Sequence, residues 1–259
     1  KATGEVMAIG NSFEGALMKA VRSLEQNVHA LRLPKHIELS DEEIEEKLSD
    51  VDDERIFVVT EALRRGISSD VIFNATKIDR WFLDRLQMIV DMENTLRAGT
   101  LDPATMQLAK EMGFADSYIG FLCGKERKEI KALRESMGIR PAFKMVDTCA
   151  AEFAAQTPYF YATYDEENEA LEFLNREDHS KKTIVVLGSG PIRIGQGIEF
   201  DYASVHCVWS LKQLGYEVVI INNNPETVST DFDTADRLYF EPLTDEDVMN
   251  VLNTEKPYG

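Results

Sequence analysis

The sequence predicts a two-part fold, in which an irregular all-α segment is followed by a truncated, doubly wound parallel α/β unit. Two observations carry this prediction. Capped stretches with helical periodicity dominate residues 27–176, and continuous apolar runs flank a glycine-rich loop after Lys182. With 259 residues, of which 44% are hydrophobic, the chain is long enough for one large domain or two medium ones.

The first 26 residues are predicted to form one strand and one helix. Residues 5–9 form an apolar, strand-like run that ends at Gly10. From Phe13 to Leu24, apolar residues recur at the helical spacing i, i+3, i+4, i+7, with Ser12 placed to cap the helix. Because one strand and one helix cannot enclose a core, we expect this segment to pack on another part of a larger protein.

The next 150 residues, 27–176, read as short helices joined by short links. A capping box at Ser40 and Glu43 opens one of them, and Asp102 before Pro103 opens another. The longest predicted helix runs from Asp79 to about Ala98, and its expected core residues are Phe82, Leu86, Ile89, Val90 and Leu96. The aromatic run 157–164 is a predicted strand, and the charged stretch 165–181 is a predicted linker.

A βαβ unit begins at Lys182. The apolar runs Thr183–Leu187 and Glu217–Ile221 are typical of buried parallel strands. We expect the helix between them to carry its inward-facing apolar residues at Val205, Val208, Trp209, Leu211 and Leu214. A further helix is predicted from Asp245 to about Leu252, and a further strand is expected where the chain stops, at Tyr258–Gly259.

The composition excludes several classes of function. A net charge of −18 repels nucleic-acid phosphates and anionic lipids, so we expect neither partner. Acidic residues crowd the stretch 38–54, which reads as a solvated helix face rather than a metal site, because Ca²⁺-loop spacing is absent. The sequence has no membrane-spanning apolar run and no signal-peptide pattern. Three scattered cysteines, Cys123, Cys149 and Cys207, suit a reducing compartment and are expected to be buried.

The glycine-rich loop after the first βαβ strand differs from a dinucleotide site. Its glycines Gly188, Gly190 and Gly195 are spaced GxGxxxxG, and the second strand ends in Asn222–Asn224 with no acid to hold a ribose. These departures disfavour a nicotinamide-dependent dehydrogenase. A small polar ligand at the carboxyl edge of the sheet is favoured, although a glycine turn without a ligand stays an alternative.

Two long runs of residues in the βαβ unit resemble those of a known family. The run from Val186 to Tyr202 and the run from Asn222 to Pro242 closely resemble the large subunit of carbamoyl-phosphate synthetase, at the start of its second, carbamoyl-phosphate-synthesising half. The first ten residues resemble the end of the first ATP-grasp half. The resemblance therefore implies three parts. These are the end of the first half (1–26), a helical oligomerisation domain (27–176) and a Rossmann-like pre-ATP-grasp part of the second half (177–259).

The resemblance implies a ligase for arginine and pyrimidine biosynthesis. The family makes carbamoyl phosphate in the cytoplasm from bicarbonate, two ATP and ammonia, which a small glutaminase subunit releases from glutamine. ATP, Mg²⁺ or Mn²⁺, and K⁺ bind the ATP-grasp domains proper, which the resemblance places outside this chain. We therefore expect an internal fragment that self-associates, holds no metal or cofactor, has no assignable catalytic residue and is inactive alone.

The resemblance also implies which residues line the path of the carbamate intermediate. In the glycine-rich loop and its helix these are Arg193, Gly195, Gln196, Gly197, Glu199 and Asp201. In the loop after the second strand they are Asn224, Glu226, Thr227 and Ser229. Ser189 departs from the Gly or Ala that the family often has there.

Two alternatives stay open. Gly197 either leaves room for a passing molecule or simply needs a positive φ. The chain is either a piece of the ligase, whose own role is then scaffolding through its helical domain, or an unrelated helical regulator joined to a nucleotide-binding module.

Overall fold

The computed structural model describes residues 6–26, 28, 30–99, 101–150, 152, 157–176, 180–193, 195–197, 199–225, 227–231 and 233–259. The chain divides into two compact units, each described by itself below. The helical unit comprises Ser12–Val21 and Gln26–Gly138, and the sheet unit comprises Lys1–Asn11, Arg22–Glu25 and Ile139–Gly259. Among the described residues, no helix combines the length and the apolar character that crossing a membrane requires.

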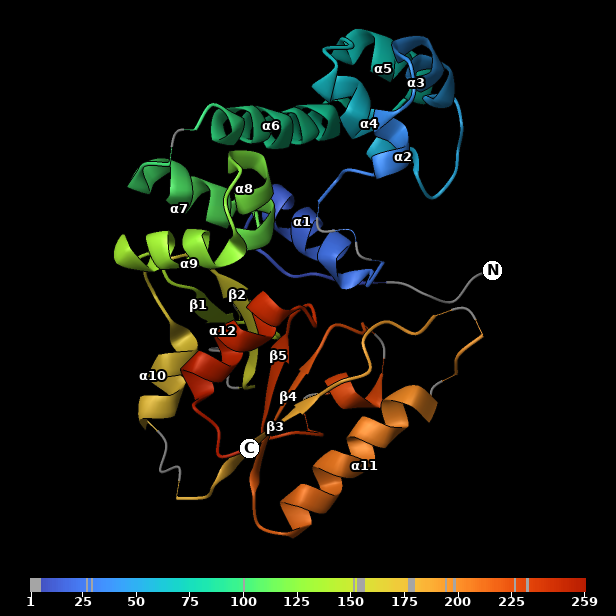
Figure 1. Cartoon of the computed structure of the whole chain (residues 1–259). Helices are drawn as coiled ribbons and strands as arrows, with labels where there is room; N and C mark the ends of the chain where they lie inside the picture. The colour runs from blue at the N-terminus through green and yellow to red at the C-terminus, as the bar shows by residue number, and fades with distance from the viewer. Residues whose placement is uncertain are drawn as a thin grey trace. The chain divides into compact units, whose positions relative to one another are not determined.

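The helical unit is built from short helices, as the sequence predicts (Figure 1). Their bounds are α1 Phe13–Ser23, whose last two residues belong to the sheet unit, α2 Pro34–Ile37, α3 Asp41–Lys47, α4 Arg55–Arg64, α5 Ser69–Thr76, α6 Arg80–Arg97, α7 Pro103–Glu111, α8 Asp116–Cys123 and α9 Arg127–Ser136. The predicted caps are confirmed at Ser12, Ser40 and Asp102, whose side chains accept backbone N–H groups. Ser68 caps α5 in the same way.

The core of α6 differs from the prediction at one residue. Leu86, Ile89, Val90 and Leu96 are buried as expected, but Phe82 is 44% exposed and Leu83 takes the inward position. The ring of Phe82 instead lies in an aromatic cluster with Phe13 and Trp81, at centroid separations of 5.5 and 5.0 Å. This cluster is an apolar surface of the helical unit.

Buried ion pairs connect the helices of this unit. Asp116 at the start of α8 accepts from Lys110 of α7 and from Arg134 of α9, each at 2.9 Å. Glu93 of α6 is fully buried and accepts from Arg64 of α4 at 2.7 Å and from Tyr118. A buried charge is tolerated only when it is paired in this way, so these carboxylates fix how the helices pack.

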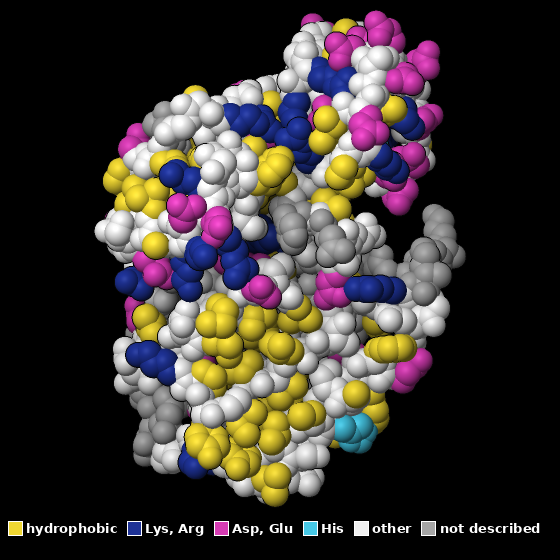
Figure 2. Space-filling model, viewed as in Figure 1, with side chains coloured by type: hydrophobic (Ala, Val, Ile, Leu, Met, Phe, Trp, Pro, Cys, Tyr) yellow, Lys and Arg dark blue, Asp and Glu magenta, His cyan; other side chains and the backbone are white. Residues whose placement is uncertain are grey.

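The acidic stretch forms a solvated surface. Of the residues of α3, only Ile44 is buried, and the acidic residues around it are exposed. Figure 2 shows Asp and Glu side chains gathered in this part of the helical unit. The interpretation as a charged, solvated helix face is confirmed.

The sheet unit holds a five-stranded sheet of order β1-β2-β5-β4-β3 (Figure 1). Its strands are β1 Ala142–Met145, β2 Tyr159–Thr163, β3 Thr183–Leu187, β4 Glu217–Asn222 and β5 Arg237–Phe240, and its helices are α10 Glu169–Arg176, α11 Glu199–Gln213, the 3₁₀ turn Val228–Thr230 and α12 Asp245–Glu255. Strands β2, β5, β4 and β3 are parallel, and β1 pairs with β2 in the antiparallel sense. The predicted parallel sheet is confirmed.

Helices cover both faces of this sheet, as a doubly wound unit requires. Val208 of α11 packs with Val218 and Ile220 on one face. On the other face, Val251 of α12 and Ala170 of α10 pack in a core with β1, β2, β4 and β5. Figure 1 shows α11 on one side of the strands and α10 and α12 on the other.

Several predictions for the sheet unit are corrected. Residues 6–10 form no strand. The predicted linker 165–181 contains α10, which packs on β1, so residues 139–176 fold with the sheet. On α11, Trp209 is 39% exposed, and Leu214 lies beyond the helix end at 73% exposure. The expected burial of the cysteines is also wrong, since Cys123 and Cys149 are half-buried and Cys207 is exposed.

The last residues of the chain are hydrogen-bonded to β3. The backbone N–H of Tyr258 donates to the carbonyl of Thr183 at 2.8 Å, and Val185 donates to the carbonyl of Gly259 at 2.9 Å. These two bonds place the end of the chain alongside β3, but residues 256–259 form no strand, so the strand expected there stays a prediction. Apolar side chains gather on the surface around α12 and the neighbouring strands (Figure 2), and the exposed ones of this unit include Leu187, Met249 and Tyr258.

Candidate functional site

The polar residues predicted to form a site lie where β3 and β4 end. Asn222, the last residue of β4, is fully buried, and its side chain makes hydrogen bonds to three other segments at this edge. Its side-chain oxygen accepts from the backbone N–H of Gly190 at 3.1 Å. Its amide nitrogen donates to Ser229 Oγ at 2.7 Å and to Asp201 Oδ1 at 3.3 Å. One side chain thus links the glycine-rich loop, the start of α11 and the loop after β4.

Asp201, in the first turn of α11, is fully buried and is saturated by internal hydrogen bonds. Its Oδ2 accepts from the backbone N–H of Ser229 at 2.9 Å, and its Oδ1 accepts from the hydroxyl of Ser229. The hydroxyls of Ser229 and Thr227 lie 3.1 Å apart. Asp201 therefore positions the loop after β4, and the geometry leaves it no oxygen directed toward solvent.

Gly188 allows the glycine-rich loop to approach Asn222. A Cβ at position 188 would lie within 3.0 Å of the side-chain atoms of Asn222, closer than real Cβ atoms approach. The next glycine, Gly190, has φ +70°, a backbone conformation that side chains other than glycine rarely adopt. Close approach and positive φ are therefore the local reasons for these two glycines.

Arg193 and Gln196 are hydrogen-bonded to each other in the glycine-rich loop. The backbone N–H of Gln196 donates to the carbonyl of Arg193 at 2.9 Å, and the N–H of Arg193 donates to the side-chain oxygen of Gln196 at 3.1 Å. Gly195 turns the chain with φ +86°. The guanidinium of Arg193 pairs with Glu25 and its side chain is 54% exposed, so it lies at the rim of the site.

Gly197 has no positive φ, so the conformational explanation for this glycine is wrong. The three atoms nearest to a Cβ there all belong to the carboxylate of Glu199, which is the end of a flexible side chain. Glu199 is the first residue of α11 and is exposed, and its carboxylate lies beside the Cα of Gly197. The small size of residue 197 therefore keeps space beside an exposed carboxylate.

Three side chains at this edge have buried polar atoms without partners. These atoms are Ser189 Oγ, both amide atoms of Asn223 and the amide nitrogen of Asn224, and none has a hydrogen-bond partner among the described residues. Asn223 and Asn224 are only 1% and 5% exposed. A buried polar group left without a partner costs about 1–3 kcal/mol, and such groups call for an explanation. Together they offer donors and an acceptor to a small hydrogen-bonding molecule.

The charges at this edge do not fit a nucleotide phosphate. The N-terminus of a helix normally attracts phosphate, but the first turn of α11 already holds the carboxylates of Glu199 and Asp201. Among the residues that the structure describes, no group of three or more His, Cys, Asp or Glu side chains lies close enough together to hold a metal ion. The residues present suit a small neutral or singly charged polar molecule better than ATP or a metal.

The structure thus brings together part of the predicted set. Asp201, Thr227 and Ser229 form one hydrogen-bonded cluster, and Asn224 lies in the same loop. Arg193 and Gln196 form the separate hydrogen-bonded pair described above, with Gly195 between them in sequence, and Gly197 and Glu199 follow. Glu226 lies outside the described residues. The sequence analysis missed the linking role of Asn222 and the unpartnered Ser189 and Asn223, although three consecutive Asn residues at a strand end were a usable signal.

Two protein-family models match the chain, one in each half. The family model described as the carbamoyl-phosphate synthetase large chain, oligomerisation domain, matches residues 5–138, and the one described as the carbamoyl phosphate synthase preATP-grasp domain matches residues 180–259. The first match spans the helical unit, and the second spans the part of the sheet unit from β3 to the end of the chain. The chain belongs to the family of carbamoyl-phosphate synthetase large chains.

Similar proteins include two bacterial relatives named carbamoyl phosphate synthase large chain. The one from Agathobacter rectalis is 55% identical over 259 residues, and the one from Lachnoclostridium phytofermentans is 55% identical over 260 aligned residues. In both cases the alignment covers 100% of this chain and 24% of the relative. The chain therefore spans about a quarter of the length of these relatives.

Proposed function

We propose that this chain is part of an ATP-dependent carbon–nitrogen ligase that makes carbamoyl phosphate from bicarbonate, ammonia and two ATP. The observation that supports this most strongly is the 55% identity along the whole chain to proteins named carbamoyl phosphate synthase large chain. The unpartnered polar atoms of Ser189, Asn223 and Asn224 add independent support. Their amide and hydroxyl groups suit a small planar molecule with oxygen atoms, such as carbamate.

In this proposal, the chain supplies a positioning site and a scaffold, while the chemistry on ATP belongs to other parts of the protein. The edge formed by Gly197, Glu199 and Asn224 lines the path or the site of the intermediate. Asp201 and Ser229 hold that edge in place from behind through their hydrogen bonds. Glu226 belongs to the same proposed loop. The isolated chain is accordingly expected to be inactive.

The wider assignments are proposals of the same kind. They include a small glutaminase subunit as partner, ATP with Mg²⁺ or Mn²⁺ and K⁺ as cofactors of the whole protein, a cytoplasmic location, and a role in arginine and pyrimidine biosynthesis. Among the described residues, no group of three or more His, Cys, Asp or Glu side chains could hold the metal. The boundaries 1–26, 27–176 and 177–259 likewise stay a prediction.

Substitution of Gly197 in a full-length large chain tests the proposed path. Because φ at this position is not positive, Gly197→Ala is expected to be tolerated, whereas Gly197→Leu fills the space beside Glu199. We expect the leucine variant to lose carbamoyl phosphate synthesis while bicarbonate-dependent ATP hydrolysis continues. Glu199→Gln should mainly slow synthesis. Equal activity of the alanine and leucine variants would contradict the path and leave scaffolding as the role of this edge.

We further propose that the helical unit self-associates through the aromatic cluster of Phe13, Trp81 and Phe82. Trp81 and Phe82 are 49% and 44% exposed, and contiguous exposed apolar surface marks interaction sites. Trp81→Glu should lower the mean mass measured by light scattering across a concentration series. Val51→Glu is the matched control, because Val51 is 82% exposed and belongs to no such cluster. If both variants keep the mass of the parent chain, this surface is not the interface.

A further inference from the structure

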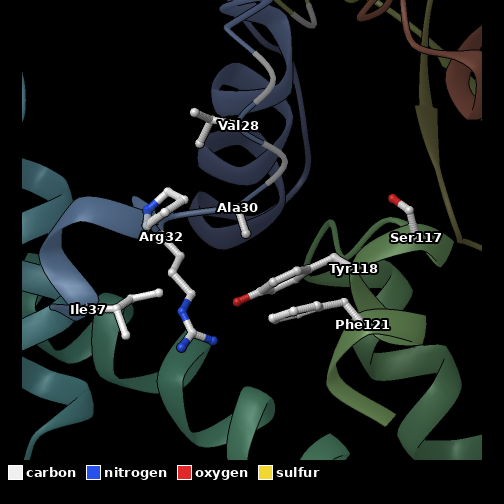
Figure 3. A pocket seen from close by; sticks show the side chains of 8 residues that line it. Val28, Ala30, Arg32, Ile37, Ser117, Tyr118 and Phe121 are labelled. Carbon is white, nitrogen blue, oxygen red and sulfur yellow. The ribbon is translucent and has the colours of Figure 1, made fainter. Parts of the chain in front are cut away.

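A cavity of about 300 Å³ lies within the helical unit, away from the site described above. Figure 3 shows side chains from two parts of this unit directed into it. The cavity is lined by Val28, Ala30, Arg32, Pro34, Ile37, Ser117, Tyr118 and Phe121. Its volume lies at the lower end of the range found for small-molecule sites.

The walls of this cavity are apolar and partly aromatic. The rings of Tyr118 and Phe121, both on α8, stack with a centroid separation of 6.0 Å and an interplanar angle of 11°. The hydroxyl of Tyr118 already donates to Glu93 at 2.7 Å, so Tyr118 offers its ring rather than its hydroxyl. Phe121 is 64% exposed, which is unusual for a phenylalanine that borders a cavity. An apolar ligand body would remove this ring from water.

Arg32 brings the one formal charge among the residues that line the cavity. Its guanidinium carbon lies 5.7 Å from the centroid of Phe121, and its Nε is buried without a hydrogen-bond partner among the described residues. No carboxylate in the described part of the chain pairs with it. Arg64 and Arg134 of the same unit, by contrast, pair with carboxylates at 2.7 and 2.9 Å, whereas Arg55, like Arg32, has a buried Nε without a partner among the described residues.

The contrast is informative because acidic groups are abundant in this protein. The chain has 46 Asp and Glu residues against 28 Lys and Arg residues, yet none of the described acids occupies the position beside Arg32. A guanidinium in an apolar setting favours a bidentate carboxylate partner. One arginine beside aromatic rings suits a single carboxylate with an apolar body, whereas a phosphate group calls for more donors than this cavity supplies.

We propose that this cavity binds a small monocarboxylate with an aromatic or branched apolar body. The carboxylate pairs with Arg32, and the apolar body packs between Phe121, Tyr118 and Ile37. This site is independent of the proposed path at the edge of the sheet, and it does not require that the chain belong to an active ligase.

Calorimetric titration of the full chain with 3-phenylpropionate tests the proposal, and 3-phenylpropanamide serves as the neutral probe of the same shape. We expect the carboxylate to bind at least about tenfold more tightly than the amide, since charge-assisted hydrogen bonds are the strong ones. Arg32→Gln should weaken binding of the carboxylate by about the same factor and leave binding of the amide unchanged. Phe121→Ala should weaken both probes.

Arg140→Gln is the matched control, because it removes the same charge from an exposed arginine outside the cavity. It should leave both affinities unchanged. The proposal is overturned if the two probes bind equally, if neither binds at millimolar concentration, or if Arg32→Gln has no more effect than Arg140→Gln. It is also overturned if Arg32→Gln lowers the mass of an oligomer in sedimentation while no probe binds, because the cavity would then belong to an interface between copies.

Discussion

Asp201→Asn tests whether one buried carboxylate holds the carboxyl edge of the sheet together. The carboxylate accepts from the backbone N–H and the hydroxyl of Ser229 and from the amide of Asn222. Asparagine has nearly the same shape, but one of its two positions becomes a donor. The backbone N–H of Ser229 can only donate, so the oxygen of the new side chain must stay at the position of Oδ2. The amide nitrogen then takes the position of Oδ1, where it faces the amide nitrogen of Asn222.

The expected loss follows from counting these bonds. The hydroxyl of Ser229 can rotate to accept, so that bond survives, whereas the bond from Asn222 is lost and the bond from the backbone N–H loses its charge assistance. A hydrogen bond to a charged group contributes about 1.5–3 kcal/mol, and a neutral one about 1 kcal/mol. We therefore expect Asp201→Asn to lower the free energy of unfolding of the sheet unit by about 2–4 kcal/mol.

The two tryptophans of the chain make the measurement selective. Trp81 lies on α6 of the helical unit and Trp209 on α11 of the sheet unit, so a Trp81→Phe background reports on the sheet unit alone. Urea unfolding followed by fluorescence of Trp209 then gives the difference. Glu199→Gln, an exposed change on the same turn of α11, should shift stability by less than about 0.5 kcal/mol. An Asp201→Asn variant as stable as this control would refute the reasoning.

Two further predictions use the same approach. Gly188→Ala should destabilise the sheet unit by about 1–3 kcal/mol, because its Cβ would collide with Asn222; a loss below about 0.5 kcal/mol in the Trp209 assay would contradict this. In the helical unit, burial alone would raise the pKa of Asp116, but Lys110 and Arg134 outweigh burial and lower it below its usual value of 3.8. The contribution of Asp116 to stability is therefore complete above about pH 4 and is lost as the pH falls through the lower pKa of the folded state. Urea unfolding followed by Trp81 in a Trp209→Phe chain should show this acid loss, and Asp116→Asn, already less stable at pH 7, should show a smaller one; equal losses would count against the pairing.

The regular parts of the fold could be predicted because local patterns determine them. No tertiary information is needed to predict the helix caps at Ser40 and Asp102 or the apolar run that forms β3. Strand β5 could not be predicted from the sequence, because it is only four residues long and starts with the buried Arg237. That charge is tolerated only through Glu255 at 2.8 Å and Glu217, which are distant in sequence. The position of Phe82 was missed for a similar reason, since its aromatic partner Phe13 lies on another helix.

The candidate site could be located from the sequence but not resolved into roles. The motif places Asp201 and Ser229 correctly at the edge, yet only the structure distinguishes the saturated carboxylate of Asp201 from the exposed one of Glu199. Whether a buried amide finds a partner depends on three-dimensional packing, so the run of three Asn residues indicates a polar edge but does not tell which amide lacks a partner. The same holds for Arg32, whose missing carboxylate partner is a property of its neighbourhood.

The pairing of β2 with β5 has a consequence for synthesis of the protein. Tyr159 lies opposite Leu238 in the register, and 238 minus 159 gives 79 residues between partners. At about 5–20 residues per second, roughly 4–16 seconds separate their appearance on the ribosome. During this interval the β1–β2 hairpin lacks its neighbour, and a two-stranded hairpin is at best marginally stable alone. The chain from 26 to 138 has by then been made in full. The nascent chain therefore carries a completed helical unit beside an uncovered apolar hairpin, which is the stage at which a chaperone, or a second nascent chain, would have access to it.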